Sequence, residues 1–216
     1  YLKLSEEERN ERLIFAVENN LYDMTKLLLK AGADVNTIAS EIYNNTVLIL
    51  AAEKGYEGIV RLLLDKGACL FSRDVHKDTP FSRAIRYGRD SVVKLFLKRG
   101  MDPNFRLTSY SLMPLYVAVS GNHYGVVKQL LDAGADVNIF NYESVLEFAA
   151  DRGKIEMVNF LLDCGVDINL GHGDALKAAL MRGHDDVVQL LVMRGINLDL
   201  KSTWGGATAL TMIARR

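Results

Sequence analysis

The strongest constraint on this chain is a pattern that recurs along almost its whole length. Residues 126–138 read VVKQLLDAGADVN, and related segments begin at residues 24, 59, 92, 157 and 187. The glycines that these segments share are spaced 30 to 35 residues apart. A fixed period of this size is typical of solenoid proteins, in which each repeat is one supersecondary unit that stacks on the next.

Each recurrence predicts a short helix with a defined end. The apolar residues within 126–131 form one stripe on a 3.6-residue period. Gly134 follows directly and can adopt the left-handed conformation that closes a helix. Asp136 and Asn138 then favour a turn, because their side chains bond to nearby backbone groups.

A second helix type precedes each of these segments. Its starts carry helix-capping residues, such as Ser5 with Glu8, and Thr79 followed by Pro80. One alanine in each of these helices is expected to allow close approach of neighbouring first helices, namely Ala51, Ala84, Ala118, Ala149 and Ala178. Larger side chains, such as Leu63, Leu130 and Leu161, are expected to fill the layer of second helices.

The combined unit, T-P-L-x-x-A-A-x-x-G followed by V-V-x-L-L-L-x-x-G-A-D-V-N, resembles the ankyrin repeat. The resemblance implies an all-α fold, a solenoid of stacked antiparallel helix pairs joined by β-hairpin fingers. We expect a single array over residues 1–216, as a fragment of a longer protein. Its copies are expected at about residues 5–37, 41–73, 74–106, 107–140, 141–170 and 171–200, with a partial copy at 201–216.

Two features depart from the family pattern. The histidine that usually follows T-P-L is replaced in every copy, by Ile49, Ser82, Tyr116, Glu147, Lys177 and Thr211. The hydrogen bonds that this histidine supports in the family are therefore not expected here. The intervals before Leu146 and Leu176 are also short, which predicts short or irregular fingers in the fifth and sixth copies.

Charge and cysteine content exclude several functional classes. The net charge is -1, so no overall field favours nucleic acid or an anionic membrane. Residues 74–106 carry eight basic and four acidic residues, but residues 109–216 carry nine and twelve, so a basic stripe does not continue. No apolar run approaches the roughly 18 residues that span a bilayer. Cys69 and Cys164 lie in distant copies, which favours free thiols and an intracellular protein, cytoplasmic or nuclear.

Chemistry-bearing residues do not form a catalytic pattern. His123 and His184 occupy the start of a second helix, where a structural role is expected. Cysteine and histidine residues lack metal-ligand spacing, and Cys164 has no basic neighbour in sequence to activate its thiol. We therefore expect no catalytic residues, no metal site and no cofactor, and interpret the chain as a non-enzyme.

The resemblance implies that a partner protein or peptide lies against the finger tips and the exposed ends of the first helices. Large tip residues of this kind often anchor interfaces, although the tips could instead pack on neighbouring fingers. By position, the partner-binding residues are expected to be Tyr43, Lys54, His76, Arg86, Tyr87, Tyr110, Leu112, Tyr142, Arg152, Arg182 and Trp204. A basic column could meet an acidic partner, and it comprises Lys54, Arg86, Arg152, Arg182 and Arg216.

Two other interpretations remain open. The array could recruit substrates for a multidomain enzyme or effector whose catalytic part lies outside these residues. The resemblance also implies that asparagines at the repeat ends could be substrates for asparaginyl hydroxylation, at Asn36, Asn104, Asn138 or Asn169.

Overall fold

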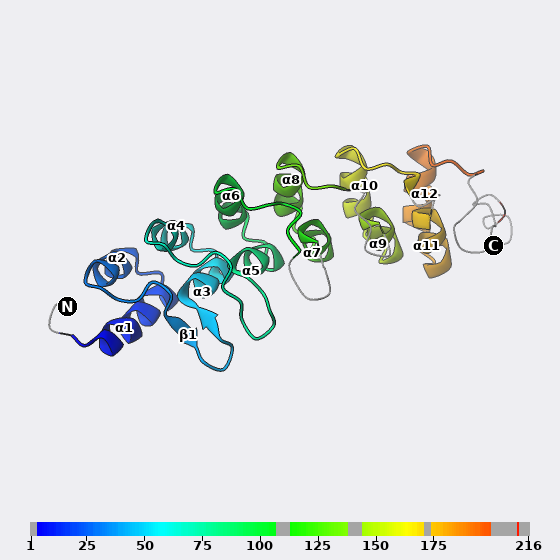
Figure 1. Ribbon diagram of the computed structural model, residues 1–216. Helices are drawn as coiled ribbons and strands as arrows, with labels where there is room; N and C mark the ends of the chain where they lie inside the picture. The colour runs from blue at the N-terminus through cyan, green and yellow to red at the C-terminus, as the bar shows by residue number, and fades with distance from the viewer. Residues whose placement is uncertain (1–3, 107–112, 138–143, 171–173, 200–210, 212–216) are drawn as a thin grey trace. The chain divides into compact units, whose positions relative to one another are not determined.

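Helices joined by turns dominate the computed structural model, which describes residues 4–106, 113–137, 144–170, 174–199 and 211 (Figure 1). Contacts divide the chain into two compact units, unit 1 over residues 1–121 and unit 2 over residues 122–216. The predicted all-α class is confirmed, and strand structure in the described residues is confined to one short hairpin. The partial seventh copy, apart from residue 211, lies outside the described residues.

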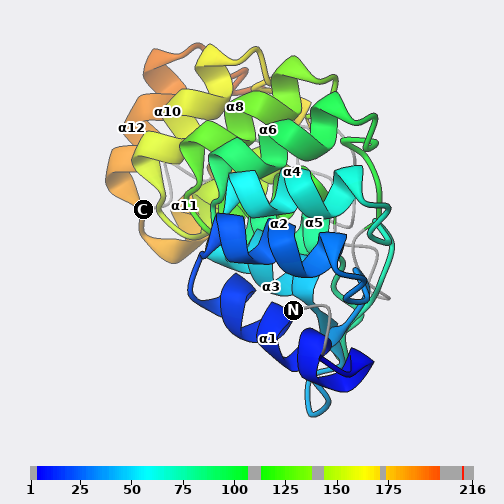
Figure 2. The ribbon, with the colours of Figure 1, turned by 90° about the vertical axis from the view of Figure 1, so that its left-hand side faces the viewer.

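Unit 1 stacks its helices in two layers, and neighbours within each layer contact one another (Figures 1 and 2). The first-helix layer contains α1 (Glu6–Glu18), α3 (Val47–Lys54), α5 (Pro80–Arg86) and α7 (Pro114–Ser120). The second-helix layer contains α2 (Tyr22–Lys30), α4 (Glu57–Asp65) and α6 (Asp90–Lys98). Each helix in these layers has 7 to 13 residues, so it is marginal alone and depends on packing against its neighbours.

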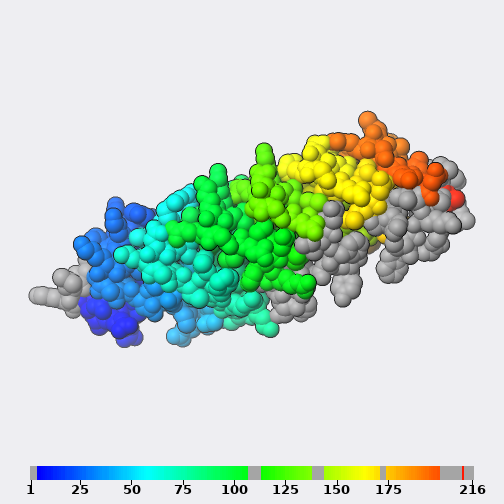
Figure 3. All heavy atoms as spheres, turned by 45° about the horizontal axis from the view of Figure 1, so that its top comes forward, coloured from blue at the N-terminus to red at the C-terminus, as the bar shows by residue number. Residues whose placement is uncertain are grey.

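Unit 2 repeats the same arrangement. Its helices are α8 (Tyr124–Asp132), α9 (Val145–Asp151), α10 (Ile155–Asp163), α11 (Asp174–Arg182) and α12 (Asp185–Met193). Helix α9 packs on α11, and α10 packs on α12. Within each unit the colours of Figure 3 run in sequence order, as expected when each helix pair contacts the pairs next to it in the chain.

Side-chain caps begin many of the first helices. Ser5 and Glu8 form a reciprocal capping box at α1, as predicted, with the Glu8 N–H donating to Ser5 Oγ at 3.1 Å. Thr79 caps α5 and forms the same kind of box with Ser82, while Pro80 occupies the first turn. Ser82 stands where the family histidine would lie, and its hydroxyl joins this cap.

The second helices lack such caps: the side chains of their N-cap residues do not bond to the backbone of the first turn. Four of these side chains instead bond to the preceding repeat, namely those of Tyr56, Arg89, Lys154 and His184. Arg89 Nε donates to the Glu53 carbonyl at 2.7 Å, and the His184 ring bonds to the Asp151 carbonyl at 2.9 Å. The structural role predicted for His184 is therefore confirmed.

The helix ends follow the predicted pattern. The repeat glycines adopt left-handed backbone conformations, including Gly134 with φ of 88°. Asp34, Asp102 and Asp167 each accept a backbone N–H two residues later, which forms the predicted turn. The corresponding partner of Asp136, Asn138, lies outside the described residues.

The core contains the predicted small and large residues, with one correction. Ala51, Ala84, Ala118 and Ala149 are fully buried, as are Leu63, Leu130 and Leu161. Ala178 is only half-buried, and Ala179 is the fully buried alanine of α11. The prediction for this helix was wrong by one residue, since Ala178 occupies the position that Phe148 holds in α9.

One finger is a two-stranded antiparallel hairpin. Strands β1 (Ile38–Ser40) and β2 (Asn45–Thr46) pair with Thr46 opposite Ile38. The next finger, residues 72–78, turns without a strand ladder. The predicted short fingers of the fifth and sixth copies fall largely on residues 138–143 and 171–173, which lie outside the described residues. Over the part of the chain that the structure describes, no helix is long and apolar enough to cross a bilayer.

Candidate functional site

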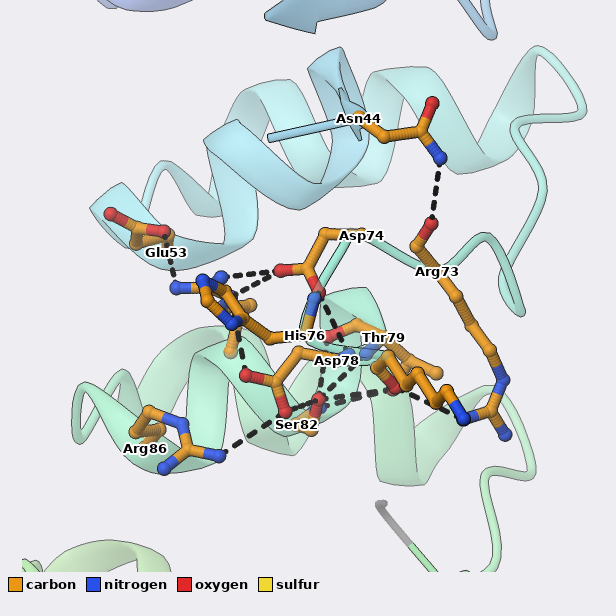
Figure 4. Close-up of polar contacts among 11 residues, drawn as sticks. Asn44, Glu53, Arg73, Asp74, His76, Asp78, Thr79, Ser82 and Arg86 are labelled. Carbon is orange, nitrogen blue, oxygen red and sulfur yellow. Dashed lines mark hydrogen bonds and ion pairs between the residues drawn. The ribbon is translucent and has the colours of Figure 1, made fainter. Parts of the chain in front are cut away.

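The first finger presents an exposed apolar tip. Ile42 is 80% exposed and Tyr43 is 54% exposed. The backbone of this tip is nevertheless anchored to the second finger: the Val75 N–H donates to the Tyr43 carbonyl at 3.0 Å. Asn44 Nδ2 also donates to the Arg73 carbonyl at 3.2 Å (Figure 4). The tip backbone is thus fixed while its large side chains remain available.

The second finger is organised around a buried carboxylate. Asp74 Oδ1 accepts the N–H groups of His76 at 2.8 Å and Asp78 at 2.9 Å (Figure 4). Lys77 takes a left-handed conformation with φ of 62°, so this tight turn needs such external support. The carboxylate of Asp74 therefore sets the shape of the loop that carries His76.

Arg83, on helix α5, interacts with the carboxylates of the second finger. Its Nε donates to Asp74 Oδ2 at 2.8 Å, and its Nη1 lies 3.3 Å from Glu53 Oε2. Its Nε also lies 3.5 Å from Asp78 Oδ2. Burial alone would lower the pKa of Arg83, but the hydrogen bond and charge of Asp74, with Asp78 and Glu53, raise it. This guanidinium remains charged and joins one finger to two first helices.

Asp78 links the same loop to the start of α5. Its Oδ1 accepts the Ser82 hydroxyl at 3.1 Å and Arg86 Nη2 at 3.2 Å. The predicted binding residue Arg86 is therefore already in an ion pair with a buried carboxylate. To contact a partner, the Arg86 guanidinium must either bind Asp78 and the partner at the same time or break its ion pair with Asp78.

These elements surround one open hollow of about 460 Å³ in unit 1, which we call the finger-side hollow. It is lined by residues from α1, the two fingers, α3 and α5, namely Glu18, Tyr43, Asn45, Leu50, Glu53, Lys54, His76, Arg83 and Tyr87. Four predicted binding residues, Tyr43, Lys54, His76 and Tyr87, are thus brought together. All four are exposed.

Some lining residues did not stand out in the sequence. Glu18, Leu50 and Arg83 carry no motif of their own. Arg83 could have been found from helical spacing, because it lies one turn before Arg86 and Tyr87 on the same face of α5. No comparable signal marks Glu18, which reaches the hollow from the preceding repeat.

Unit 2 contains a related hollow of about 430 Å³ between α9 and α11. Its lining includes Asp151, Met181 and the predicted binding residue Arg182. Arg182 Nε donates to Asp151 Oδ1 at 2.8 Å. The predicted binding residue Arg152 lies over the Phe148 ring at 3.9 Å from its centroid, and 3.6 Å from Asp151 Oδ2. Both arginines therefore have partners within the unit.

The remaining predicted binding residues, Tyr110, Leu112, Tyr142 and Trp204, lie outside the described residues. Arg216 of the basic column does so too.

The described residues can also be compared with the requirements of a metal site and of a reactive thiol. They contain no group of three or more His, Cys, Asp or Glu residues that could hold a metal ion. Cys69 and Cys164 are free thiols. Burial, with the negative charge of Asp163, raises the pKa of the Cys164 thiol. The unreactive thiol form is therefore favoured at neutral pH.

Comparison with known proteins agrees with this architecture. A family model described as ankyrin repeats, in three copies, matches residues 13–107, 77–141, 106–172 and 146–216. The crystal structure of the ankyrin repeat domain of Bcl-3 superimposes with a TM-score of 0.78 at 26% identity. That match covers 93% of this chain and 92% of the Bcl-3 domain.

Two curated relatives extend far beyond the matched region. The Caenorhabditis elegans protein "Ankyrin repeat and KH domain-containing protein mask-1" is 32% identical over 204 residues, which is 93% of this chain but 8% of that protein. The Danio rerio protein "Putative palmitoyltransferase ZDHHC13" is 28% identical over 210 residues, covering 93% of this chain and 32% of that protein. The chain therefore spans less than a third of the length of either relative.

Proposed function

The chain belongs to the ankyrin-repeat family, whose fold is used for protein–protein interaction, and from this premise we propose that it is a non-catalytic binding module. In this proposal a partner protein or peptide occupies the finger-side hollow of unit 1. The array then acts as an adaptor, scaffold or regulatory element in an intracellular protein.

One observation carries the proposal. Residues from α1, the two fingers, α3 and α5 converge on one open hollow, and its two tyrosines, Tyr43 and Tyr87, are 54% and 43% exposed. Tyrosine is enriched at interface hot spots because it offers a large apolar surface together with a hydroxyl group. The hollow is therefore suited to a partner that inserts an apolar or aromatic side chain between the tyrosines.

The hollow is also preorganised. Asp74, Asp78 and Arg83 fix the second finger through bonds to its backbone and to α5. Because the loop is already ordered, binding of a partner loses little conformational entropy in the second finger, and the free-energy cost of association is lower. The buried carboxylates are already satisfied, so they do not need the partner to neutralise them.

An acidic partner is a narrower version of the proposal. Lys54 is exposed on the rim of the hollow, whereas Arg86 and Arg182 already pair with Asp78 and Asp151. These two arginines of the predicted column are therefore already engaged in ion pairs within their units. We place the acidic contact at Lys54, where exposed charge would mainly assist the rate of association.

The direct test compares tyrosine variants with a matched control. Tyr43→Ala and Tyr87→Ala, separately and together, should weaken capture of the partner because each removes an anchor worth about 2 kcal/mol or more at a hot spot. Tyr22→Ala is the control, because Tyr22 on α2 has the same 43% exposure as Tyr87 but does not line the hollow. The readout is affinity-capture mass spectrometry from cells, followed by titration with the captured protein.

Equal binding by the double variant and by Tyr22→Ala, with unchanged circular dichroism, would refute the finger-side hollow as the site. The predicted anchors Tyr110 and Trp204 offer a second test on the same principle. Their joint replacement by alanine is expected to abolish binding while the fold is retained.

A second candidate function is substrate recruitment for an enzyme. The relative named as a putative palmitoyltransferase supports it, because the region similar to this chain is 32% of that protein and the rest lies outside the match. In this version the finger-side hollow binds a substrate of a catalytic domain on the same polypeptide. The full-length coding sequence, and an activity assay with the tyrosine variants, would separate the two candidates.

A further inference from the structure

A series of asparagine contacts joins consecutive repeats at the ends of their second helices. The Cys69 N–H of the second copy donates to Asn36 Oδ1 of the first copy at 2.9 Å. In unit 2 the Asn197 N–H donates to Asn169 Oδ1 at 2.8 Å. Each contact lets the side chain of one repeat satisfy a backbone donor of the next.

The second copy departs from this series. Its segment reads GACLF where the first copy reads GADVN, so Phe71 stands at the position of Asn36. A phenylalanine ring cannot accept the backbone N–H of the next repeat in this way. Instead, Phe71 contacts Phe105, with ring centroids 5.8 Å apart and planes tilted by 46°.

Beside this aromatic pair lies an apolar hollow of about 250 Å³, which we call the aromatic hollow. Its lining comprises Leu70, Phe71, Phe96, Arg99, Gly100, Met101, Asp102 and Phe105. Phe96 and Met101 are buried and form its base, whereas Phe71 remains 56% exposed at its edge. It shares no residue with the finger-side hollow.

The size and lining indicate the kind of group that the hollow can accept. Its volume is below the range of about 300–1,000 Å³ typical of small-molecule pockets. It is large enough for one apolar side chain, and its aromatic edge provides contacts that such a side chain favours. A half-exposed aromatic pair beside a buried apolar base is a feature of interaction surfaces.

The two segments that line the aromatic hollow are rich in basic residues. Segments 65–73 and 94–106 contain six exposed basic residues, Lys66, Arg73, Lys94, Lys98, Arg99 and Arg106, against two acidic ones, Asp65 and Asp102. Asp65 is paired with Arg99, and Asp102 Oδ1 accepts the Asn104 N–H. These two segments therefore carry a net positive charge, which complements an acidic partner.

We propose that the aromatic hollow is a second docking surface, which takes one apolar anchor side chain from a peptide segment with acidic residues on both sides of the anchor. The buried apolar base and the small volume of the hollow favour insertion of one apolar side chain of a peptide, whereas nucleic-acid bases stack on exposed aromatic faces. This surface is independent of the finger-side hollow, so either proposal can fail alone.

The test uses the full 216-residue chain and a synthetic fluorescent peptide with a central phenylalanine flanked by glutamates. Control peptides replace the phenylalanine with alanine or the glutamates with lysines. Binding is measured by fluorescence anisotropy at low and high salt, and the site is mapped by NMR chemical-shift changes. We expect saturable binding of the first peptide, weakened by salt, with shift changes at Met101 and Phe105.

Phe71→Asn is the decisive variant, because it installs the residue that the first copy carries at this position. The variant should therefore fold, and it should bind the peptide about tenfold or more weakly through loss of the anchor contact. Tyr43→Ala should bind the peptide like the wild-type chain. Equal binding by Phe71→Asn would overturn the proposal. So would equal binding of the alanine peptide, or tighter binding of a single-stranded oligouridine.

Discussion

At the scale of single residues, two left-handed glycines of unit 2 differ in their surroundings. Gly134 has φ of 88° and open space where a Cβ would lie. Gly153 has φ of 64°, and a Cβ there would lie 2.6 Å from His184 Nδ1. The first glycine is needed only for its backbone conformation, whereas the second also makes room for the ring that joins two repeats.

Gly134→Ala should destabilise the chain by about 1–2 kcal/mol, which is the cost of a left-handed conformation for an L-residue. Gly153→Ala should cost about 1–3 kcal/mol more, because the added methyl group displaces the His184 ring. Urea unfolding of both variants measures the difference in the free energy of unfolding. The difference should disappear when His184→Ala is added to both, and its persistence would show that the ring is not its cause.

At the scale of elements, the start of α1 should respond to pH. The Ser5 backbone N–H donates to Glu8 Oε2 at 2.8 Å. This bond, and then the Ser5 hydroxyl, lowers the pKa of Glu8. A lowered pKa in the folded state means that the cap stabilises α1 at neutral pH. The stabilisation is lost as the pH falls from the ordinary glutamate pKa of about 4.3 through the folded value.

The Ser5 amide chemical shift, followed by NMR from neutral to acidic pH, should therefore report a transition below the ordinary glutamate range. Glu8→Gln keeps an acceptor but cannot titrate, so its Ser5 amide should lack this transition. A wild-type transition at or above the ordinary value would contradict the proposed cap energetics.

The second finger and α5 should depend on the Asp74 carboxylate. Asp74→Ala would leave Arg83 without its closest partner and remove the acceptor of two backbone N–H groups. Removing one member of a buried ion pair typically costs about 3–5 kcal/mol. Asp74→Asn should cost less, because its amide oxygen can still accept the backbone donors. Denaturant unfolding measures the free energy of unfolding of each variant, and Asp74→Asn should lose less of it than Asp74→Ala.

At the scale of the whole molecule, stability should be distributed through contacts between neighbouring repeats. Leu130 is fully buried in α8, and the Tyr124 ring of the same helix contacts Phe160 of α10 at 5.4 Å between centroids. Leu130→Ala should destabilise by about 2–5 kcal/mol through cavity formation. Hydrogen exchange should quicken in α8 and also in α9 and α10, because each repeat is stabilised by its neighbours.

Leu27→Ala is the matched control for this experiment. Leu27 occupies a second helix like Leu130 but is 51% exposed, so the change should alter the free energy of unfolding by less than about 1 kcal/mol. A change in hydrogen exchange confined to α8 in Leu130→Ala would contradict coupling between repeats.

The sequence alone was sufficient for features that depend on residues close together in the chain. The cap of Ser5 with Glu8, the start of α5 at Thr79–Pro80 and the left-handed Gly134 were all predictable. Each is decided by hydrogen bonds or steric limits within a few residues. The regular spacing of these signals also predicted paired helices and their stacking.

Only the tertiary structure decided features that join residues about one repeat apart. Arg83 reaches Glu53 and lies in the finger-side hollow, and Arg182 pairs with Asp151. The aromatic pair of Phe71 and Phe105 likewise joins two copies. These contacts depend on how side chains from separate repeats meet in space, and spacing along the chain does not specify which charges pair or which apolar groups remain exposed.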